Sequence, residues 1–347
     1  MKAFFHPGTV AHDPQFFLLR GRIAANEERP GRVDKLLAGL AALGVVPEEP
    51  ASFGAGPRLA VHSLEYLRFL TEAWEAWQKL PNAGEEVVAN IHPPRSAGTY
   101  PEGIVGRAGW HMSDTSCPIG PATWQSACLS ADTAVAGAQA LLDGGDLVYA
   151  LCRPPGHHAY ADRAGGHCFL NNTAIAAQYL RTKGGRAVER VAILDIDVHH
   201  GNGTQDIFYE RADVLTVSIH ADPHRFYPFF LGHACERGRG AGAGFNLNMP
   251  LALGTGDAAW LEAIEAAIRH IGVFMPDIVV IALGLDASAT DPFQGFGVTR
   301  EGFGATGRLI GRISRPLLLV QEGGYQSDDL SANLAAFLSG TLDQRRA

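Results

Sequence analysis

The chain has 347 residues, of which 46% are hydrophobic and 18% are charged, and this composition excludes an intrinsically disordered protein. Its formal net charge of −8 argues against nucleic acid as the main partner, because binding to phosphates requires a positive surface.

Segments with helical and strand-like patterns alternate along the chain. In chain order we expect a strand at 2–5, helices at 32–43, 64–80 and 122–142, a strand at 147–151, a helix at 173–183, a strand at 191–197, a short helix at 204–210, a strand at 214–220, a helix at 257–271, a strand at 278–283, a helix at 300–313, a strand at 317–321 and a last helix at 330–342. The strand segments are almost continuously apolar, which is typical of strands covered on both faces. This pattern predicts one α/β domain, residues 1–347, with a parallel sheet between two layers of helices.

Two long segments interrupt this alternation. Residues 81–121 contain six prolines and no clear periodicity, which indicates a functional loop or an interface element. Residues 225–256 contain four glycines at alternate positions, 238, 240, 242 and 244. Their spacing resembles a dinucleotide-binding motif, but no strand precedes them and no helix follows, so we expect a close approach of the backbone to the site instead.

The cysteines and the apolar runs indicate the cell compartment. The five cysteines form no C-x-x-C pair and are odd in number, which favours a reducing compartment over a disulfide framework. The first residues lack the apolar core of a signal peptide, and the most apolar run, residues 277–285, is too short to span a bilayer. We therefore expect a cytoplasmic protein without a membrane partner.

The run VAILDIDVHHGNG at residues 191–203 ends an apolar strand in two carboxylates and two imidazoles. Because side chains alternate along a strand, Asp195, Asp197 and His199 are expected on one face and His200 on the other. Carboxylates and an imidazole at this spacing form half of a site for a divalent metal, zinc above all. The alternative is a hydrogen-bonded polar cluster, but charged side chains are rarely buried without a partner, so the metal site is favoured.

Polar residues follow the other predicted strands as well, and ligands of open parallel sheets bind at the carboxyl ends of strands. The polar groups at these ends are the tandem pair His157-His158, then Ser218 and His220, then Asp286 and Asp291, and finally Glu322 and Tyr325. Taken singly, each has a simpler explanation. The tandem pair could be incidental loop imidazoles, Asp286 a helix N-cap, Ser218 a partner of backbone groups and Tyr325 a core residue, and the Asp291-Pro292 pair is interpreted as a turn only.

Together these groups supply the parts of metal-assisted amide hydrolysis. Asp197, His199 and Asp286 would form a site with three protein ligands and open positions. One imidazole of the tandem pair would accept a proton from water, and the other would protonate the leaving amine. The Tyr325 hydroxyl could donate to the developing oxyanion.

The motifs at residues 153–158, 165–172, 195–204, 284–292 and 322–325 occur in an order that resembles the zinc-dependent deacetylase family, over about residues 20–340. That family includes class II histone deacetylases and bacterial acetylpolyamine amidohydrolases. The resemblance implies the arginase–deacetylase fold, with three αβα layers and a mainly parallel sheet of about eight strands. Residues 227–232 and the segment 81–121 are most similar to the acetylpolyamine branch, in which this insertion narrows the substrate entrance and builds a homodimer.

The resemblance also implies roles for individual residues. Asp197, His199 and Asp286 would hold one zinc ion per chain. His158 would be the general base, His157 the partner oriented by Asp195, and Tyr325 the residue that polarises the carbonyl. The Gly166 carbonyl, His167 and Tyr227 would line the acyl tunnel. Two structural potassium or sodium ions would be held, the first by Asp195, Asp197, His199, Ser218 and Ile219, and the second by the carbonyls of Phe208, Arg211, Val214 and Phe245.

Three residues depart from the family pattern. Asn202 stands where class I deacetylases have an aspartate, and an amide cannot raise the basicity of His158 as a carboxylate would, although class II and polyamine enzymes share the asparagine. His167 replaces the aromatic residue of the tunnel wall, so the acyl preference stays open. Phe293 stands where the eukaryotic polyamine deacetylase has a gatekeeper glutamate, so recognition of a cation would fall to a loop acid, Asp114 or Glu102.

We therefore expect a zinc-dependent amidohydrolase that acts on acetylated polyamines or similar small acylated amines. Two alternatives stay open: a deacetylase of acetyl-lysine in proteins, and a non-catalytic protein that binds acyl-amines. A ureohydrolase of the same fold would require a second metal ion and acidic residues at positions 201 and 284. The chain has Gly201 and Gly284 at these positions, which argues against that reaction.

Overall fold

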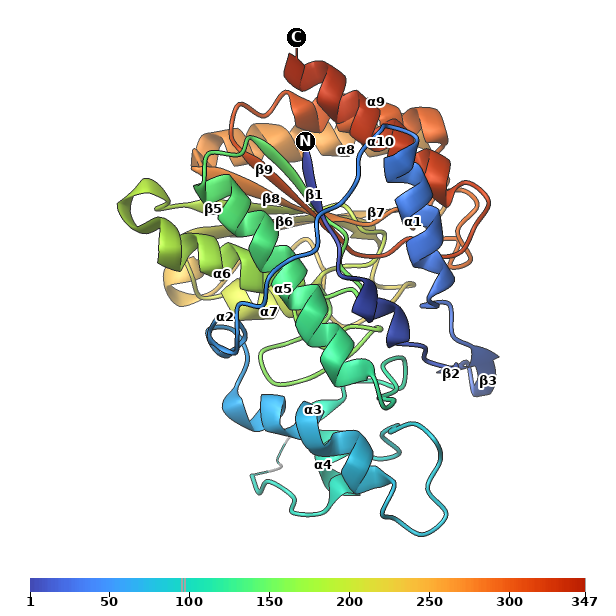
Figure 1. Cartoon of the computed structure of the whole chain (residues 1–347). Helices are drawn as coiled ribbons and strands as arrows, with labels where there is room; N and C mark the ends of the chain where they lie inside the picture. The colour runs from blue at the N-terminus through green and yellow to red at the C-terminus, as the bar shows by residue number, and fades with distance from the viewer. Residues whose placement is uncertain (95, 97, 347) are drawn as a thin grey trace.

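A parallel sheet covered by helices on both faces forms the centre of the computed structural model, which describes residues 1–94, 96 and 98–346 (Figure 1). The strand order is β1-β4-β9-β8-β5-β6-β7, and all neighbouring strands are parallel. In chain order the strands are β1 (Lys2–Phe4), β4 (Leu147–Ala150), β5 (Val191–Asp195), β6 (Val214–Ala221), β7 (Asn246–Leu251), β8 (Ile278–Leu283) and β9 (Leu317–Gln321). The predicted α/β class is confirmed, but within the described residues this sheet has seven strands rather than about eight.

Two hydrophobic clusters hold the helices against the two faces of the sheet. Along β4, Leu147 and Tyr149 belong to one cluster, whereas Val148 and Ala150 belong to the other, as the alternation of side chains on a strand requires. The first cluster packs against α1 (Gly31–Ala41), α8 (Asp257–Phe274), α9 (Arg300–Gly311) and α10 (Leu330–Arg346), and the second against α5 (Thr123–Leu142) and α6 (Asn172–Gly184).

The order of the strands places a crevice between β5 and β8. The chain continues from β5 to β6 and β7 on one side, and from β8 to β9 on the other. Such a reversal of strand order leaves room at the carboxyl ends of the two central strands, where ligands of open α/β sheets bind.

The two segments predicted as long loops contain regular structure. The edge strand β7 lies within residues 225–256, and its sequence NLNMPL carries two asparagines and a proline instead of an apolar run, which concealed it. Within residues 81–121, α4 (Ile104–His111) packs beside α3 (Leu64–Trp77) in a lobe that projects from the end of the sheet (Figure 1). A two-stranded hairpin, β2 (Phe16–Leu19) with β3 (Arg22–Ala25), was also not predicted.

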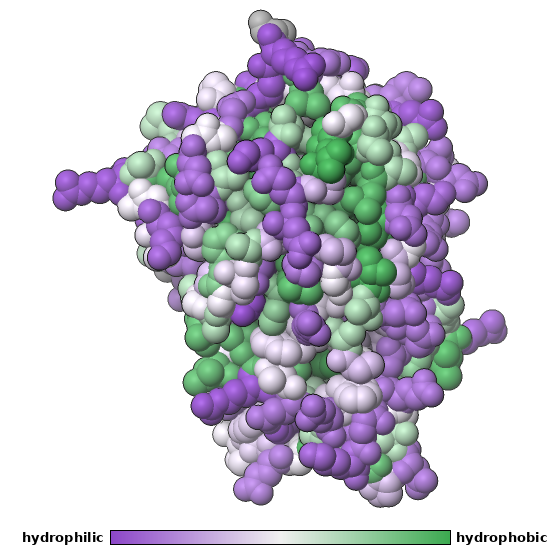
Figure 2. Space-filling model, in the orientation of Figure 1, coloured by the Kyte–Doolittle hydropathy of each residue, from purple (hydrophilic) through white to green (hydrophobic). Residues whose placement is uncertain are grey.

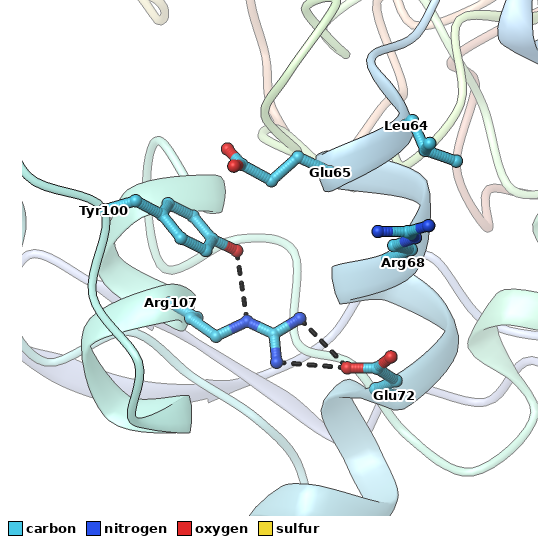
Figure 3. A pocket seen from close by; sticks show the side chains of 6 residues that line it. All are labelled: Leu64, Glu65, Arg68, Glu72, Tyr100 and Arg107. Atoms are coloured by element: carbon cyan, nitrogen blue, oxygen red, sulfur yellow. Dashed lines mark hydrogen bonds and ion pairs between the residues drawn. The ribbon is translucent and has the colours of Figure 1, made fainter.

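An open pocket of about 500 Å³ lies between α3 and α4 and is lined mainly by charged side chains (Figure 3). Arg107 donates to Glu72 Oε2 from both terminal nitrogens at 3.1 Å, and its Nε lies 3.1 Å from the Tyr100 hydroxyl. The residues predicted for catalysis are not among those that line this pocket.

Hydrophilic side chains are spread over the face shown in Figure 2, with apolar patches between them. Among the described residues, no helix has both the length and the hydropathy that are needed to cross a membrane.

The contact between α9 and α10 depends on a glycine. A Cβ atom at Gly307 would collide with the Phe337 carbonyl oxygen, whereas Gly272, exposed on α8, has open space around it. We expect Gly307→Ala to lower the free energy of unfolding by about 1–3 kcal/mol because the helices must separate. The control Gly272→Ala should be neutral or stabilising by up to about 1 kcal/mol. Urea unfolding of both variants measures this difference, and equal stabilities would show that the helices can adjust at no cost.

Candidate active site

Two aspartates and a histidine converge at the crevice between β5 and β8. β5 ends at Asp195, so Asp197 and His199 lie beyond the strand, and the predicted strand over 191–197 was too long. Strand alternation therefore does not bring them together. Instead, side-chain oxygens hold the turn: Asp195 Oδ1 accepts from the Asp197 backbone N–H at 3.1 Å, and Asp197 Oδ1 accepts from that of His199 at 2.9 Å. Asp286 Oδ1, from the loop after β8, accepts from Val198 N–H at 2.9 Å.

One ligand atom from each of Asp197, His199 and Asp286 lies within 4.8 Å of the others, and all three residues are buried. His199 Nδ1 is 3.1 Å from Asp197 Oδ1 and 3.0 Å from Asp286 Oδ2. Burial and the neighbouring Asp197 raise the pKa of Asp286 to about 8, although His199 opposes the shift. Two buried carboxylates beside an imidazole match the donors that a divalent ion requires, so the residues fit a metal such as zinc.

Glycines allow the backbone to approach this cluster closely. A Cβ atom at Gly284 would collide with Asp197, one at Gly201 with Asp195, and one at Gly323 with both Asp197 and Asp286. A ureohydrolase would need carboxylates at positions 201 and 284. Here the side chains of Asp195 and Asp197 already occupy the space that a side chain at these positions would need.

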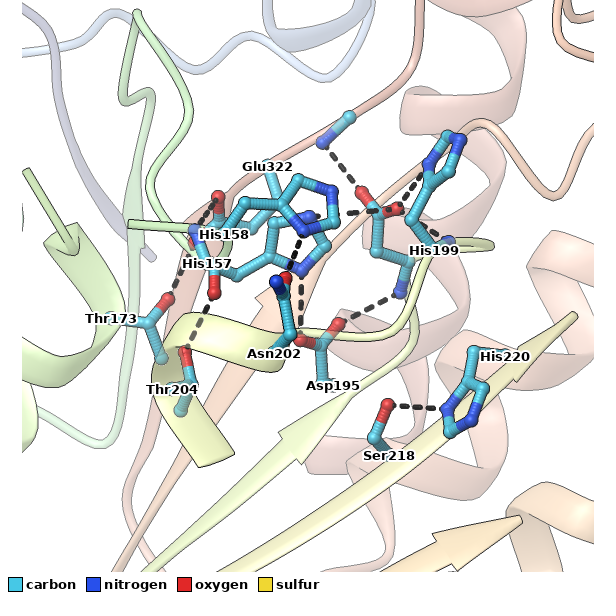
Figure 4. Close-up of polar contacts among 12 residues, drawn as sticks. His157, His158, Thr173, Asp195, His199, Asn202, Thr204, Ser218, His220 and Glu322 are labelled. Atoms are coloured by element: carbon cyan, nitrogen blue, oxygen red, sulfur yellow. Dashed lines mark hydrogen bonds and ion pairs between the residues drawn. The ribbon is translucent and has the colours of Figure 1, made fainter. Parts of the chain in front are cut away.

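The tandem histidines lie beside the carboxylate cluster, with ring centroids 4.0 Å apart (Figure 4). His157 Nδ1 is 2.9 Å from Asp195 Oδ2, and His158 Nδ1 is 2.6 Å from Asn202 Oδ1. Burial lowers the pKa of both rings, but Asp197 and Asp195 outweigh this effect at His157 and raise its pKa to about 10. At His158 the neighbouring His157 and His199 add to burial, and the pKa lies well below its usual value. The two rings are therefore driven toward opposite protonation states.

Glu322 accepts hydrogen bonds from the backbone of the loop that carries the tandem histidines. Its Oε2 accepts from the backbone N–H groups of Gly156 at 2.6 Å and His157 at 3.0 Å, and its Oε1 accepts from the Thr173 hydroxyl at 2.7 Å (Figure 4). Glu322, His157 and Cys168 also place ligand atoms close together, but these hydrogen bonds already engage the carboxylate. The sequence marked Glu322 only as a polar residue at a strand end.

Tyr325 is buried against an arginine that the sequence did not single out. Arg32, at the start of α1, donates from Nε to the Gly324 carbonyl at 2.7 Å and from Nη2 to the Glu322 carbonyl at 2.6 Å. Its guanidinium carbon lies 4.9 Å from the centroid of the Tyr325 ring, and Nη1 pairs with Glu28 Oε1 at 2.6 Å. An arginine on an ordinary amphipathic helix carries no signal of such contacts, which only the fold reveals.

Asp291 also holds Tyr325, so the interpretation of Asp291-Pro292 as a turn only was incomplete. The Asp291 carboxylate is buried, and it accepts from the Tyr325 backbone N–H at 3.0 Å and from that of Phe293 at 2.9 Å. One side chain thus connects the turn that carries Tyr325 with the turn that carries Phe293.

Aromatic rings surround the approach to the cluster. The Phe293 ring centroid lies 4.8 Å from that of Tyr325 and 5.5 Å from that of His199, and His167 lies 5.8 Å from Tyr325. The Tyr227 ring packs against His158 at 4.9 Å, and its hydroxyl donates to Asp114 Oδ2 at 2.6 Å.

Asp114 is therefore held by neighbouring hydrogen-bond donors. Besides Tyr227, its carboxylate accepts from the backbone N–H groups of Gly166 at 3.1 Å and Ser116 at 2.8 Å. Glu102, the other loop acid considered for a cationic substrate, is exposed just ahead of α4. These hydrogen bonds engage both oxygens of the Asp114 carboxylate.

The residues predicted to hold monovalent cations lie at two places beside β6. Ser218 pairs with Asp195 across the β5–β6 ladder, and its hydroxyl is 2.7 Å from His220 Nδ1. At the second place, the Phe208 carbonyl accepts from Arg211 N–H and the Phe245 carbonyl from Thr216 N–H, both at 3.0 Å. Each carbonyl keeps a second lone pair.

The fold and this set of side chains define the class of protein: a metal-dependent hydrolase with the arginase–deacetylase architecture. Residues 26–341 match the histone deacetylase domain, and the chain belongs to that family.

Individual relatives are similar over nearly the whole chain. The sequence is 45% identical over 343 residues to acetylpolyamine amidohydrolase of Burkholderia pseudomallei, covering 98% of each chain. It is 42% identical over 330 residues to acetylpolyamine amidohydrolase 2 of Pseudomonas aeruginosa, covering 95% of each. A crystal structure of the acetylpolyamine aminohydrolase from Burkholderia pseudomallei superposes with a TM-score of 0.95 at 44% identity, covering 99% of both chains.

The variant Arg32→Lys tests whether the contacts of Arg32 hold Tyr325 in place. It keeps the charge beside Glu28 but loses the hydrogen bonds of the planar guanidinium. We expect the variant to fold. Its kcat for an acylated amine should fall by about tenfold to a hundredfold, because a displaced Tyr325 hydroxyl is no longer aligned with the substrate carbonyl. KM should change little. The control Arg29→Lys alters an exposed arginine of the same region, which donates to the Asn26 carbonyl, and should leave kcat unchanged. If Arg32→Lys and the control have equal kcat values, Arg32 does not position Tyr325 for the reaction.

Proposed function

We propose that this protein hydrolyses the acetyl amide of acetylated polyamines or of similar small acylated amines, with one zinc ion. The observation that carries the proposal is the buried cluster of Asp197, His199 and Asp286 beside two histidines of opposite proton affinity. Similarity to acetylpolyamine amidohydrolases over 98% of the chain supports the same substrate class.

The ligands of the zinc ion would be Asp197, His199 and Asp286. When bound, such an ion polarises the acyl carbonyl and lowers the pKa of a water molecule. The other steps belong to the protein. His158 accepts the proton of the attacking water at Nε2, because its Nδ1 faces the Asn202 amide oxygen. His157, held by Asp195, carries the proton that the leaving amine requires.

Tyr325 donates a hydrogen bond from its hydroxyl to the substrate carbonyl oxygen as negative charge develops there. Burial raises the pKa of Tyr325 well above its usual value, so the hydroxyl keeps its proton. A hydrogen bond of this kind contributes about 3–4 kcal/mol to transition-state stabilisation. Arg32 and Asp291 hold the turn from which the hydroxyl donates.

The aromatic approach supports a slender amine as the substrate. Phe293, His167 and Tyr227 would form the walls of an acyl tunnel with the Gly166 carbonyl, and a methylene chain suits such walls. The faces of aromatic rings also attract an ammonium group beyond the amide. An acetyl-lysine side chain offers the same methylenes but brings a bulky backbone, so deacetylation of proteins is the second candidate.

We further propose that residues 81–121 narrow the entrance and form part of a homodimer interface, and that the protein is cytoplasmic. The lobe of α3 and α4, which projects from the sheet, supports a role for this segment outside the core. The two predicted sites beside β6 remain our proposals for potassium or sodium.

A panel of substrates on one zinc-loaded preparation tests the proposed function. We expect acetylputrescine, acetylcadaverine and acetylspermidine to be hydrolysed with a higher kcat/KM than acetyl-lysine peptides, and chelation to remove all activity. The variant Tyr325→Phe should keep its zinc and lose about two orders of magnitude or more in turnover. Preference for the peptides would favour the protein deacetylase, and no turnover of any amide would favour a non-catalytic binding protein.

Asp286→Ala tests the ligand set directly. We expect this variant to lose tight zinc binding, because only two protein ligands remain. Inductively coupled plasma mass spectrometry after gel filtration measures the zinc content. The control Asp114→Asn changes an acid at the entrance and should retain stoichiometric zinc. Stoichiometric zinc in Asp286→Ala would show that the ligands are assigned incorrectly.

A further inference from the structure

The amide of Asn202 is held between two side chains. Its Oδ1 lies 2.6 Å from His158 Nδ1, and its Nδ2 donates to the Tyr160 hydroxyl oxygen at 2.8 Å. Asn202 is buried at the first turn of α7 (Asn202–Phe208), whereas Tyr160 is only partly buried. Tyr160 is not part of the motifs that indicated the active site.

We propose that Tyr160 is a positioning residue, which fixes the Asn202 amide so that its oxygen faces His158. This inference rests on the proposed function, in which His158 is the general base. It gives a specific task to a residue two positions after the tandem histidines.

The backbones of the two segments are already fixed against each other. A Cβ atom at Gly203 would collide with the Ala159 carbonyl, and Thr204 N–H donates to the His157 carbonyl at 3.1 Å. The remaining freedom of Asn202 is rotation about its terminal side-chain bond, and such bonds have broad torsional minima.

The direction of the amide decides which nitrogen of His158 is basic. With the Asn202 oxygen facing Nδ1, this nitrogen carries the proton and Nε2 has a free lone pair. Half a turn of the amide would present its NH₂ group to Nδ1, so the proton would move to Nε2 and the base would be lost. A carboxylate at this position would present oxygen in either orientation, so only an asparagine requires this control.

Tyr160 is itself held in place. Its backbone N–H donates to the Arg163 carbonyl at 2.9 Å, and the guanidinium carbon of Arg163 lies 4.7 Å from the centroid of its ring. The carbonyl of Ala159, beside it, accepts from Asn171 Nδ2 at 3.0 Å. The phenol is thus a fixed acceptor for the Asn202 NH₂ group.

A double-mutant cycle on the zinc-loaded enzyme distinguishes this role from general support of the fold. We expect Tyr160→Phe to lower kcat for an acetylated amine by about tenfold and to change KM by less than about twofold. In the Asn202→Asp background, the same substitution should lower kcat by less than about twofold, because both oxygens of the carboxylate accept. The matched control Tyr179→Phe removes a hydroxyl that donates to Gln139 Oε1 between α6 and α5, and it should keep kcat within about twofold of the native value.

Equal losses in both backgrounds, or no loss in the native background, would overturn the proposal. The ring nitrogens of His158, observed by ¹⁵N NMR in the native protein and in Tyr160→Phe, give a readout that does not depend on turnover. We expect Nδ1 to carry the proton in the native protein and a mixture of tautomers in the variant. If the native enzyme hydrolyses no acyl-amide, the proposed function fails, while an unchanged NMR spectrum in the variant shows that the positioning role fails.

Discussion

Two buried carboxylates lie close together beyond the carboxyl ends of β5 and β8, and the rest of the site depends on this constraint. Asp197 and Asp286 come from opposite sides of the reversal in strand order, so the topology of the sheet brings them together. Their proximity is unfavourable without a cation. Backbone N–H groups of the surrounding turns and the His199 ring offset part of this cost, and a divalent ion supplies the rest.

The class of the fold could be predicted from the sequence, because buried parallel strands are continuous apolar runs that need no context to identify. The edge strand β7 could not, since its buried positions are asparagines whose amides bond to neighbouring side chains. Likewise, α4 could not be predicted, because it lies in a proline-rich segment without clear periodicity. The resemblance implied a sheet of about eight strands, and the described residues form seven.

Much of the site could also be predicted, since its ligands and its two histidines lie in short motifs. The supporting residues could not, because their partners are distant in sequence. Arg32 contacts the turn of Tyr325 about 290 residues away, and Asp291 contacts the same turn from another loop. The convergence of Asp195, Asp197 and His199 was predicted on the assumption of an extended strand, whereas hydrogen bonds within a turn produce it.

The buried Glu28, Arg32 and Arg153 connect the amino-terminal region to the catalytic turn. Arg153 donates to the carbonyls of Thr9 and His12, pairs with Glu28, and directly precedes the loop of the tandem histidines. Exchange of the first thirty or so residues for those of a relative would therefore alter both sides of the crevice at once. Chimaeric enzymes made from this chain need their junctions outside this charged cluster, with its members inherited as one block.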